Sequence, residues 1–189
     1  MSWQSLLPLL LVGASMVTAL LIFPLRKEQR VLRNTLNLTG AGLNLLLLTV
    51  TGLGTLAGIT FETRLPLLPD YDFLLVVEEV SLLFASLSAI LWLFTTVYAI
   101  GYMQDEENLS RFFGFFSICV TAATGVALAG NILTFIVLYG LRALPGDPRV
   151  VHRGSEEALR AGRIYLVYTL LGGTVMLLGA VWFYAVAGP

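Results

Sequence analysis

The sequence predicts an all-α integral membrane protein with about six transmembrane helices. Hydrophobic residues make up 57% of the 189 residues and charged residues 12%, and the mean hydropathy is +0.85. Soluble domains carry about 25% charged residues, so this chain cannot cover itself with a water-facing surface. Its charges gather in short clusters between long apolar stretches, as loops between membrane spans do. A formal net charge of −1 gives no reason to expect nucleic-acid binding.

The first two expected spans cover residues 6–23 and 35–59. No positive residue precedes the first, so we expect a retained helix rather than a cleaved signal peptide. The second is rich in glycine, and Gly54 and Gly58 stand at the spacing that lets small residues bring two helices close together. Residues 61–72 contain two prolines and two aspartates, which predict a loop or a short interfacial segment.

The later spans depend on one uncharged stretch, Phe112 to Leu141. At about 1.5 Å per helical residue it is longer than the ~30 Å hydrocarbon core. Its strongest turn signal is Gly130-Asn131, which predicts two crossings instead of one. The fifth span is then irregular, because it must continue into a segment with two prolines and charged residues. The resulting spans cover 80–103, 112–129, 131–149 and 164–187.

The basic residues favour the model with two crossings. Positive residues in short loops mark the cytoplasmic face of a membrane protein. With two crossings ten basic residues share one face and Arg64 alone lies opposite, whereas with one crossing they divide almost evenly. We therefore expect both termini on the periplasmic side of a bacterial inner membrane. The ten residues are Arg26, Lys27, Arg30, Arg33, Arg111, Arg142, Arg149, Arg153, Arg160 and Arg163.

The irregular fifth span predicts a protein partner. A helix from Asn131 to Arg142 reaches only about 16–18 Å, short of the ~30 Å core. Irregular backbone at that depth is tolerated only where protein or a water-filled cavity shields it from lipid. We therefore expect other membrane subunits beside this region.

Few residues could carry chemistry. One histidine and one cysteine predict no haem, zinc or iron–sulfur site built by this chain alone, so we expect no cofactor and no metal. No nucleophile–base motif indicates an enzyme. His152 could relay protons near neutral pH, but a loop histidine at the headgroup boundary is the simpler interpretation. Polar residues in the spans either border an ion path or bond neighbouring helices, and the second interpretation is favoured. They are Thr35, Asn37, Asn44, Thr95, Thr96, Thr121, Thr124, Asn131, Thr134 and Tyr139.

Five strings carry a resemblance to a known family. In order and spacing, from about Glu79 to the end, they resemble the N-terminal half of the antiporter-like subunits. This family is shared by multisubunit Na⁺/H⁺ antiporters (in their D-type subunits) and respiratory complex I. The resemblance implies a helical bundle of inverted five-helix repeats and transport of H⁺ or Na⁺ within a multisubunit complex. The strings are Val97-Tyr-Ala-Ile-Gly-Tyr-Met103, Arg111-Phe-Phe-Gly-Phe-Phe116, Ala129-Gly-Asn131-Ile-Leu-Thr134, Val151-His152-Arg153-Gly154 and Glu156-Glu157-Ala158.

Two departures from the family bear on function. The family tyrosine that corresponds to Tyr139 is followed by a glutamate, paired with a lysine from a later helix, whereas this chain has Gly140. The second departure is length: the chain stops at Pro189, before the helices that carry the family's lysines, and its only lysine, Lys27, lies in the first basic loop. The chain therefore resembles a truncated family member.

Two functions remain open. In the first, the chain is a membrane subunit of a cation/proton antiporter or complex-I-like assembly and does not transport alone. Asn131, Thr134, Tyr139, Gly140 and His152 would then be candidates to border an ion path whose lysine comes from another chain. In the second, it is a non-transporting structural subunit that packs against a larger assembly. In both, any redox chemistry would lie in partner subunits.

Overall fold

Six helices and one β-hairpin make up the described part of the chain. The computed structural model describes residues 3–68, 71–103, 109–143 and 156–187. The helices are α1 (Trp3–Ile22), α2 (Arg30–Leu56), α3 (Glu79–Tyr102), α4 (Leu109–Ala127), α5 (Ile132–Ala143) and α7 (Glu156–Ala187), and the strands are β1 (Phe61–Leu68) and β2 (Tyr71–Val77).

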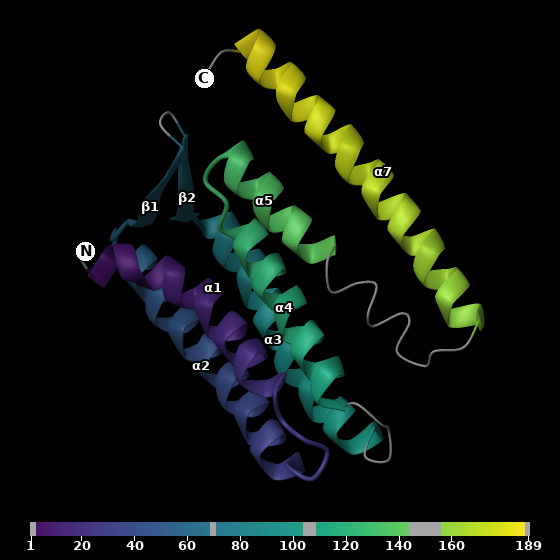
Figure 1. Ribbon diagram of the computed structural model, residues 1–189. Coiled ribbons are helices and arrows are strands. Elements are labelled where there is room, and N and C mark those ends of the chain that lie inside the picture. The colour runs from purple at the N-terminus through teal and green to yellow at the C-terminus, as the bar shows by residue number, and fades with distance from the viewer. Residues whose placement is uncertain (1–2, 69–70, 104–108, 144–155, 188–189) are drawn as a thin grey trace.

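Helices α1 to α4 pack as an up-and-down bundle (Figure 1). Helix α1 packs on α2 and α4, and α3 completes the group by packing on the same two helices. The connection between α1 and α2 and the start of α4 lie at one end, here called the basic end. The hairpin and the turn before α5 lie at the other, here called the hairpin end (Figure 1).

Four helices in the described part of the chain are long and apolar enough to cross a membrane. They are α1, α2, α3 and α4, with 20, 27, 24 and 19 residues. The chain is therefore a mostly helical membrane protein, as the composition predicts. Their apolar outer faces suit lipid or another subunit, and large side chains such as Phe84 and Phe94 are exposed there.

The last two helices differ from ordinary spans. Helix α5 has 12 residues, about 18 Å at 1.5 Å per residue, so it is too short to cross a ~30 Å core. The predicted irregular span 131–149 continues past it, and residues 144–149 lie outside the described part of the chain. Helix α7 has 32 residues and begins at Glu156 rather than at the predicted 164. It contacts α5 and stands beside the bundle (Figure 1).

The prediction of a loop over 61–72 is wrong, and with it the prediction of an all-α chain. Strands β1 and β2 pair antiparallel, with Phe61 opposite Val77 and Leu65 opposite Phe73. The register shifts between Pro66 and Leu68. Proline is tolerated in β1 because this is an edge strand and because the proline borders that irregularity.

The hairpin closes one end of the apolar core. Phe61, Leu75 and Val77 are buried and join one cluster with Leu11 of α1 and Leu48 of α2. The hydroxyl of Thr63 donates a hydrogen bond of 2.6 Å to the carbonyl of Ser5, which fastens β1 to the first turn of α1.

A non-helical segment interrupts the long apolar stretch where the sequence predicts a turn. Helix α4 ends at Ala127 and α5 begins at Ile132. Between them the backbone runs along the free edge of β2: the N–H of Val76 donates to the carbonyl of Leu128 (2.8 Å), and the N–H of Gly130 donates to the carbonyl of Leu74 (2.9 Å). A β-bridge between Leu75 and Ala129 lies between these bonds. The turn is thus held against the two-stranded sheet by strand-like pairing with β2.

Candidate functional site

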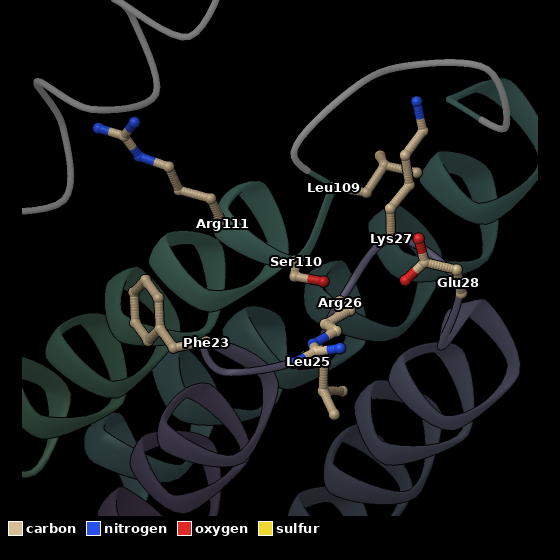
Figure 2. A pocket seen from close by; sticks show the side chains of 8 residues that line it. All are labelled: Phe23, Leu25, Arg26, Lys27, Glu28, Leu109, Ser110 and Arg111. Atoms are coloured by element: carbon tan, nitrogen blue, oxygen red, sulfur yellow. The ribbon is translucent and has the colours of Figure 1, made fainter.

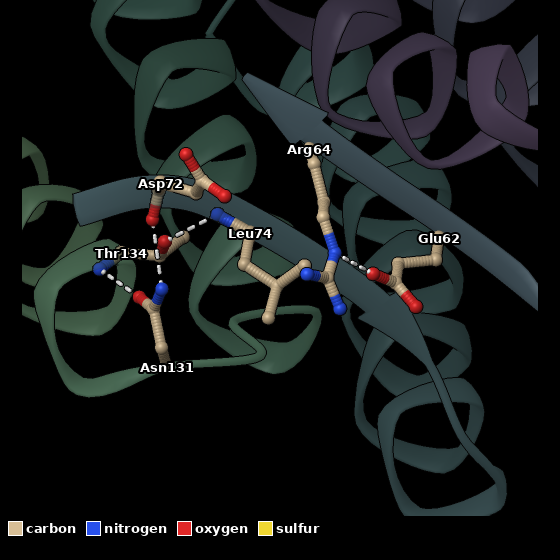
Figure 3. A network of polar contacts seen from close by, with 6 residues as sticks. All are labelled: Glu62, Arg64, Asp72, Leu74, Asn131 and Thr134. Carbon is tan, nitrogen blue, oxygen red and sulfur yellow. Dashed lines mark hydrogen bonds and ion pairs between the residues drawn. The ribbon is translucent and has the colours of Figure 1, made fainter. Parts of the chain in front are cut away.

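The junction between the hairpin and α5 contains two of the predicted ion-path residues. Asn131 precedes the first residue of α5, and its Oδ1 accepts a hydrogen bond of 2.8 Å from the backbone N–H of Thr134. This is the N-cap arrangement that asparagine favours, because the first N–H groups of a helix lack partners within it. Its Nδ2 also donates to the carbonyl of Asp72 at 2.7 Å (Figure 3).

Thr134 makes the second hydrogen bond between α5 and the hairpin. Its Oγ1 accepts a hydrogen bond of 2.8 Å from the backbone N–H of Leu74 in β2, and its side chain is fully buried. Asn131 and Thr134 therefore connect the first turn of α5 to one edge of β2 at two points (Figure 3). That they also border an ion path stays a prediction.

The outer strand carries an exposed ion pair at the same end. Arg64 donates from Nε to Oε1 of Glu62, and both side chains face solvent. The hydrogen bond and charge of Glu62 raise the pKa of Arg64 above its usual value. Arg64 remains a cation at every physiological pH in either case.

The other predicted ion-path residues lie apart from this junction. The ring of Tyr139 stacks on Phe135 with the centroids 6.1 Å apart. Gly140 is exposed on α5, and a Cβ added there would have nothing within 4 Å. His152 lies outside the described residues.

The predicted helix-packing glycines separate into two different roles. Gly54 packs against the hairpin, because a Cβ added there would stand 2.5 Å from Cζ of Phe61. For Gly58 the prediction is wrong: α2 ends at Leu56, and Gly58 follows it with a φ of 80° in open space. Glycine is favoured there because it adopts the left-handed conformation without steric cost.

Polar side chains inside the bundle bond neighbouring helices, which confirms the favoured interpretation for three of them. Nε1 of Trp92 on α3 donates to Oδ1 of Asn37 on α2 at 3.1 Å. Asn44 and Thr121 bond helix α1: Nδ2 of Asn44 donates to the carbonyl of Leu11 (3.1 Å), and Oγ1 of Thr121 donates to Oγ of Ser15 (2.8 Å). Such bonds hold helices together in lipid, where unpaired polar groups are costly.

The basic end contains two cavities. A cavity of about 490 Å³ lies between the connection from α1 to α2 and the start of α4 (Figure 2). A second cavity of about 140 Å³ lies beside the first turn of α2. The larger one is lined by Phe23, Leu25, Arg26, Lys27, Glu28, Leu109, Ser110 and Arg111.

Arg33 is the residue that the sequence reasoning misplaced. The sequence analysis predicts that Arg33 lies in a cytoplasmic loop. In the structure it lies inside α2, and its side chain is 2% exposed. No other charged side chain is buried among those whose exposure the structure describes. The spacing could have revealed it, since Arg33 shares one helical face with the buried Asn37, Gly40 and Asn44.

The described residues contain no cluster of histidine, cysteine and acidic side chains that could hold a metal ion. What they form is a bundle of apolar helices with buried polar contacts between the helices. That combination defines a multi-pass membrane protein.

Comparisons with known proteins narrow the class of membrane protein to which this chain is similar. Residues 70–113 match the family of the NADH-ubiquinone oxidoreductase (complex I) chain 5 N-terminus. The A1 subunit of a Na(+)/H(+) antiporter of Staphylococcus aureus is 24% identical over 130 residues, 67% of this chain and 16% of that protein. The A/B subunit of a probable K(+)/H(+) antiporter of Rhizobium meliloti is 26% identical over 128 residues, 66% of this chain and 13% of that protein. The chain is similar to these antiporter and complex I subunits, so the predicted resemblance is confirmed.

The fold has a counterpart among solved structures. A chain of the membrane-bound sulfane sulfur reductase, an archaeal respiratory membrane complex, superposes with a TM-score of 0.79. The match covers 95% of this chain and 28% of that one, at 18% identity. This shows that the helical arrangement is shared. The matches cover less than a third of the two curated relatives and of the solved chain.

Proposed function

We propose that this chain is a membrane subunit of a multisubunit cation/proton antiporter or of a complex-I-like proton-translocating assembly in a bacterial inner membrane, and that it does not transport ions alone. The observation that carries the proposal is the match of residues 70–113, because they include β2 and α3 and reach the first turn of α4. These elements run from the hairpin end through α3 to the basic end, so the match covers more than one isolated apolar helix. In this proposal the chain is not an enzyme and needs no cofactor, and any redox chemistry belongs to partner subunits.

The distribution of charge supports an orientation in that membrane. Arg26, Arg30 and Arg111 lie at the basic end, whereas Arg64 lies on the hairpin. Positive residues favour the cytoplasmic side, so the hairpin end faces the periplasm. Ser5 bonds the hairpin, so the N-terminus lies on the periplasmic side too. Helix α7 runs from the level of the basic end toward that of the hairpin end (Figure 1), which supports a C-terminus on the periplasmic side.

Cysteine labelling in intact cells tests this orientation. Thr60→Cys and Gln29→Cys, each in a Cys119→Ser background, leave the arginine and lysine positions unchanged. Both native side chains are exposed, near the hairpin and the basic end respectively. A membrane-impermeant maleimide should label position 60 in intact cells and position 29 only after permeabilisation. The reverse pattern would overturn the orientation.

The subunit role is tested by purification. The chain, isolated in mild detergent from its native membrane, should bring down membrane subunits whose apolar spans contain lysine or glutamate. Ion transport needs ionisable groups at membrane depth, and the buried charged residue described here, Arg33, lies within one turn of the start of α2. Purification of the chain free of any membrane partner would contradict the proposal.

One observation favours a second candidate, a structural subunit without an ion path. Gly140 stands where the family resemblance implies a glutamate, and the only lysine, Lys27, lies outside the spans. Gly140→Glu in the purified complex separates the two functions. If an ion path passes Asn131, Thr134, Tyr139 and position 140, the variant should change ΔpH-driven cation exchange in vesicles.

A matched control is available in the last helix. Gly172 is also a helical glycine with nothing within 4 Å of an added Cβ. Gly172→Glu therefore adds the same charge at membrane depth in a different place. Equal effects of the two variants, or none for Gly140→Glu, would favour the structural subunit.

A further inference from the structure

Arg33 carries a buried charge without a counter-charge in the described part of the chain. Its Nη1 donates to Oγ of Ser110 at 3.5 Å, the outer limit of a hydrogen bond, and its Nε has no partner. The guanidinium lies 5.8 Å from the ring centroid of Phe113. Among the described residues, no carboxylate forms an ion pair with it. Buried charges are normally paired, because desolvation without compensation is costly.

Arg33 also lines a cavity. Its volume of about 140 Å³ is several times the ~30 Å³ that one water occupies. Arg30, Arg33 and Asn34 from the first turns of α2 line one side, and Leu109 and Phe113 of α4 line another. Oδ1 of Asn34 is also buried without a partner. An asparagine amide can exchange its oxygen and nitrogen by a half-turn, so this group can equally present its NH₂ to a ligand. The cavity therefore combines two arginines and an amide.

The surroundings favour an anion that is attached to lipid. The larger cavity of the basic end shares Leu109 with this one and adds Arg26, Lys27 and Arg111, with Glu28 as its one acidic residue (Figure 2). Basic pockets between membrane helices on the cytoplasmic side bind anionic headgroups. In the same first turn of α2, Val31 is 80% exposed. Cationic side chains able to bind phosphate and an apolar outer surface thus lie together at the basic end, the combination that an anionic lipid requires.

We propose that the cavity beside Arg33 binds the phosphate of an anionic phospholipid. The Arg33 guanidinium supplies the buried donors and Arg30 the outer positive charge. A planar guanidinium suits this role because its parallel N–H groups match two phosphate oxygens. The proposal does not depend on whether the assembly transports ions.

Native mass spectrometry of the full chain in mild detergent tests it, with phosphatidylglycerol and phosphatidylcholine as probes. The protein should bind one phosphatidylglycerol in preference to phosphatidylcholine. Arg33→Gln should weaken that binding at least about tenfold, the weight of one charge-assisted hydrogen bond. Arg30→Gln should weaken it about fivefold, as expected for one surface cation near lipid. The matched control is Arg64→Gln at the hairpin end, which should bind as the parent does.

Further arms separate the competing explanations. If Arg33→Gln does not fold, Arg33→Lys keeps the charge but loses the two-pronged geometry, and an intermediate loss supports the proposal. Inorganic phosphate at millimolar concentration should not displace the lipid, and displacement would assign the cavity to a soluble anion instead. Equal binding of both lipids, or full binding by Arg33→Gln or Arg33→Lys, overturns the proposal.

Discussion

The hydrogen bond between Thr134 and β2 leads to a specific prediction for the free energy of unfolding. Thr134→Val replaces the hydroxyl with a methyl group of similar size, so packing is preserved. The backbone N–H of Leu74, which donates to Thr134 Oγ1 at 2.8 Å, loses its acceptor. Because the threonine is fully buried, no water replaces it. An orphaned buried donor costs about 1–3 kcal/mol.

Heating in detergent measures this cost. For a protein of this size each kcal/mol shifts the unfolding midpoint by about 2–4 °C, so a loss of about 2 kcal/mol predicts a fall of ~6 °C. Cys119, the single cysteine, is half-buried inside α4. Its reaction with a fluorogenic maleimide therefore reports the opening of the bundle.

A matched threonine separates the effect of the tie from that of the substitution. Thr49 is exposed on α2, and its hydroxyl donates to the carbonyl of Leu45 in its own helix at 2.8 Å. Thr49→Val should change stability by no more than about 0.5 kcal/mol. If Thr134→Val is as stable as Thr49→Val, the hydroxyl does not hold the hairpin to α5, and the reasoning is refuted.

Two further perturbations probe the same bundle by the same thermal assay. Gly54→Ala should destabilise the bundle by about 1–3 kcal/mol because the added methyl group meets the ring of Phe61. The control Gly52→Ala, with nothing within 4 Å of the added Cβ, should be neutral or stabilising by up to ~1 kcal/mol. Equal unfolding midpoints of the two variants would show that the ring simply moves aside. Trp92→Phe should lower the stability by about 2 kcal/mol because Oδ1 of Asn37 loses its buried donor. Adding Asn37→Leu to this variant should recover part of the lost stability. No recovery would show that only the smaller volume of the side chain at position 92 matters.

The helices could be predicted from the sequence because their signals are local. Uninterrupted apolar stretches mark α1 to α4, and the Gly130-Asn131 pair marks the break before α5. The N-cap bond of Asn131 follows from the same short-range chemistry. Boundaries differ by a few residues because charged first turns, such as that of α2, continue a helix beyond its apolar part.

The hairpin could not be predicted in this way, because its stability comes from distant partners. Pro66 and Pro69 are typical of a loop, and β2 is held by backbone of residues 128–130, far along the chain. The burial of Arg33 has the same origin, since its contact Ser110 lies 77 residues later. The pairing of Gly54 with Phe61 rather than with another helix also depends on where the hairpin folds.

The backbone pairing of residues 128–130 with β2 has a mechanical consequence. At that end, main-chain bonds join β2 to the turn before α5, and a side-chain bond joins β1 to α1. At the opposite end the described helices meet through side chains and cavities instead. If these helices rock within an assembly, they pivot about the sheet. The largest displacements then fall at the basic end, where arginines line the cavities.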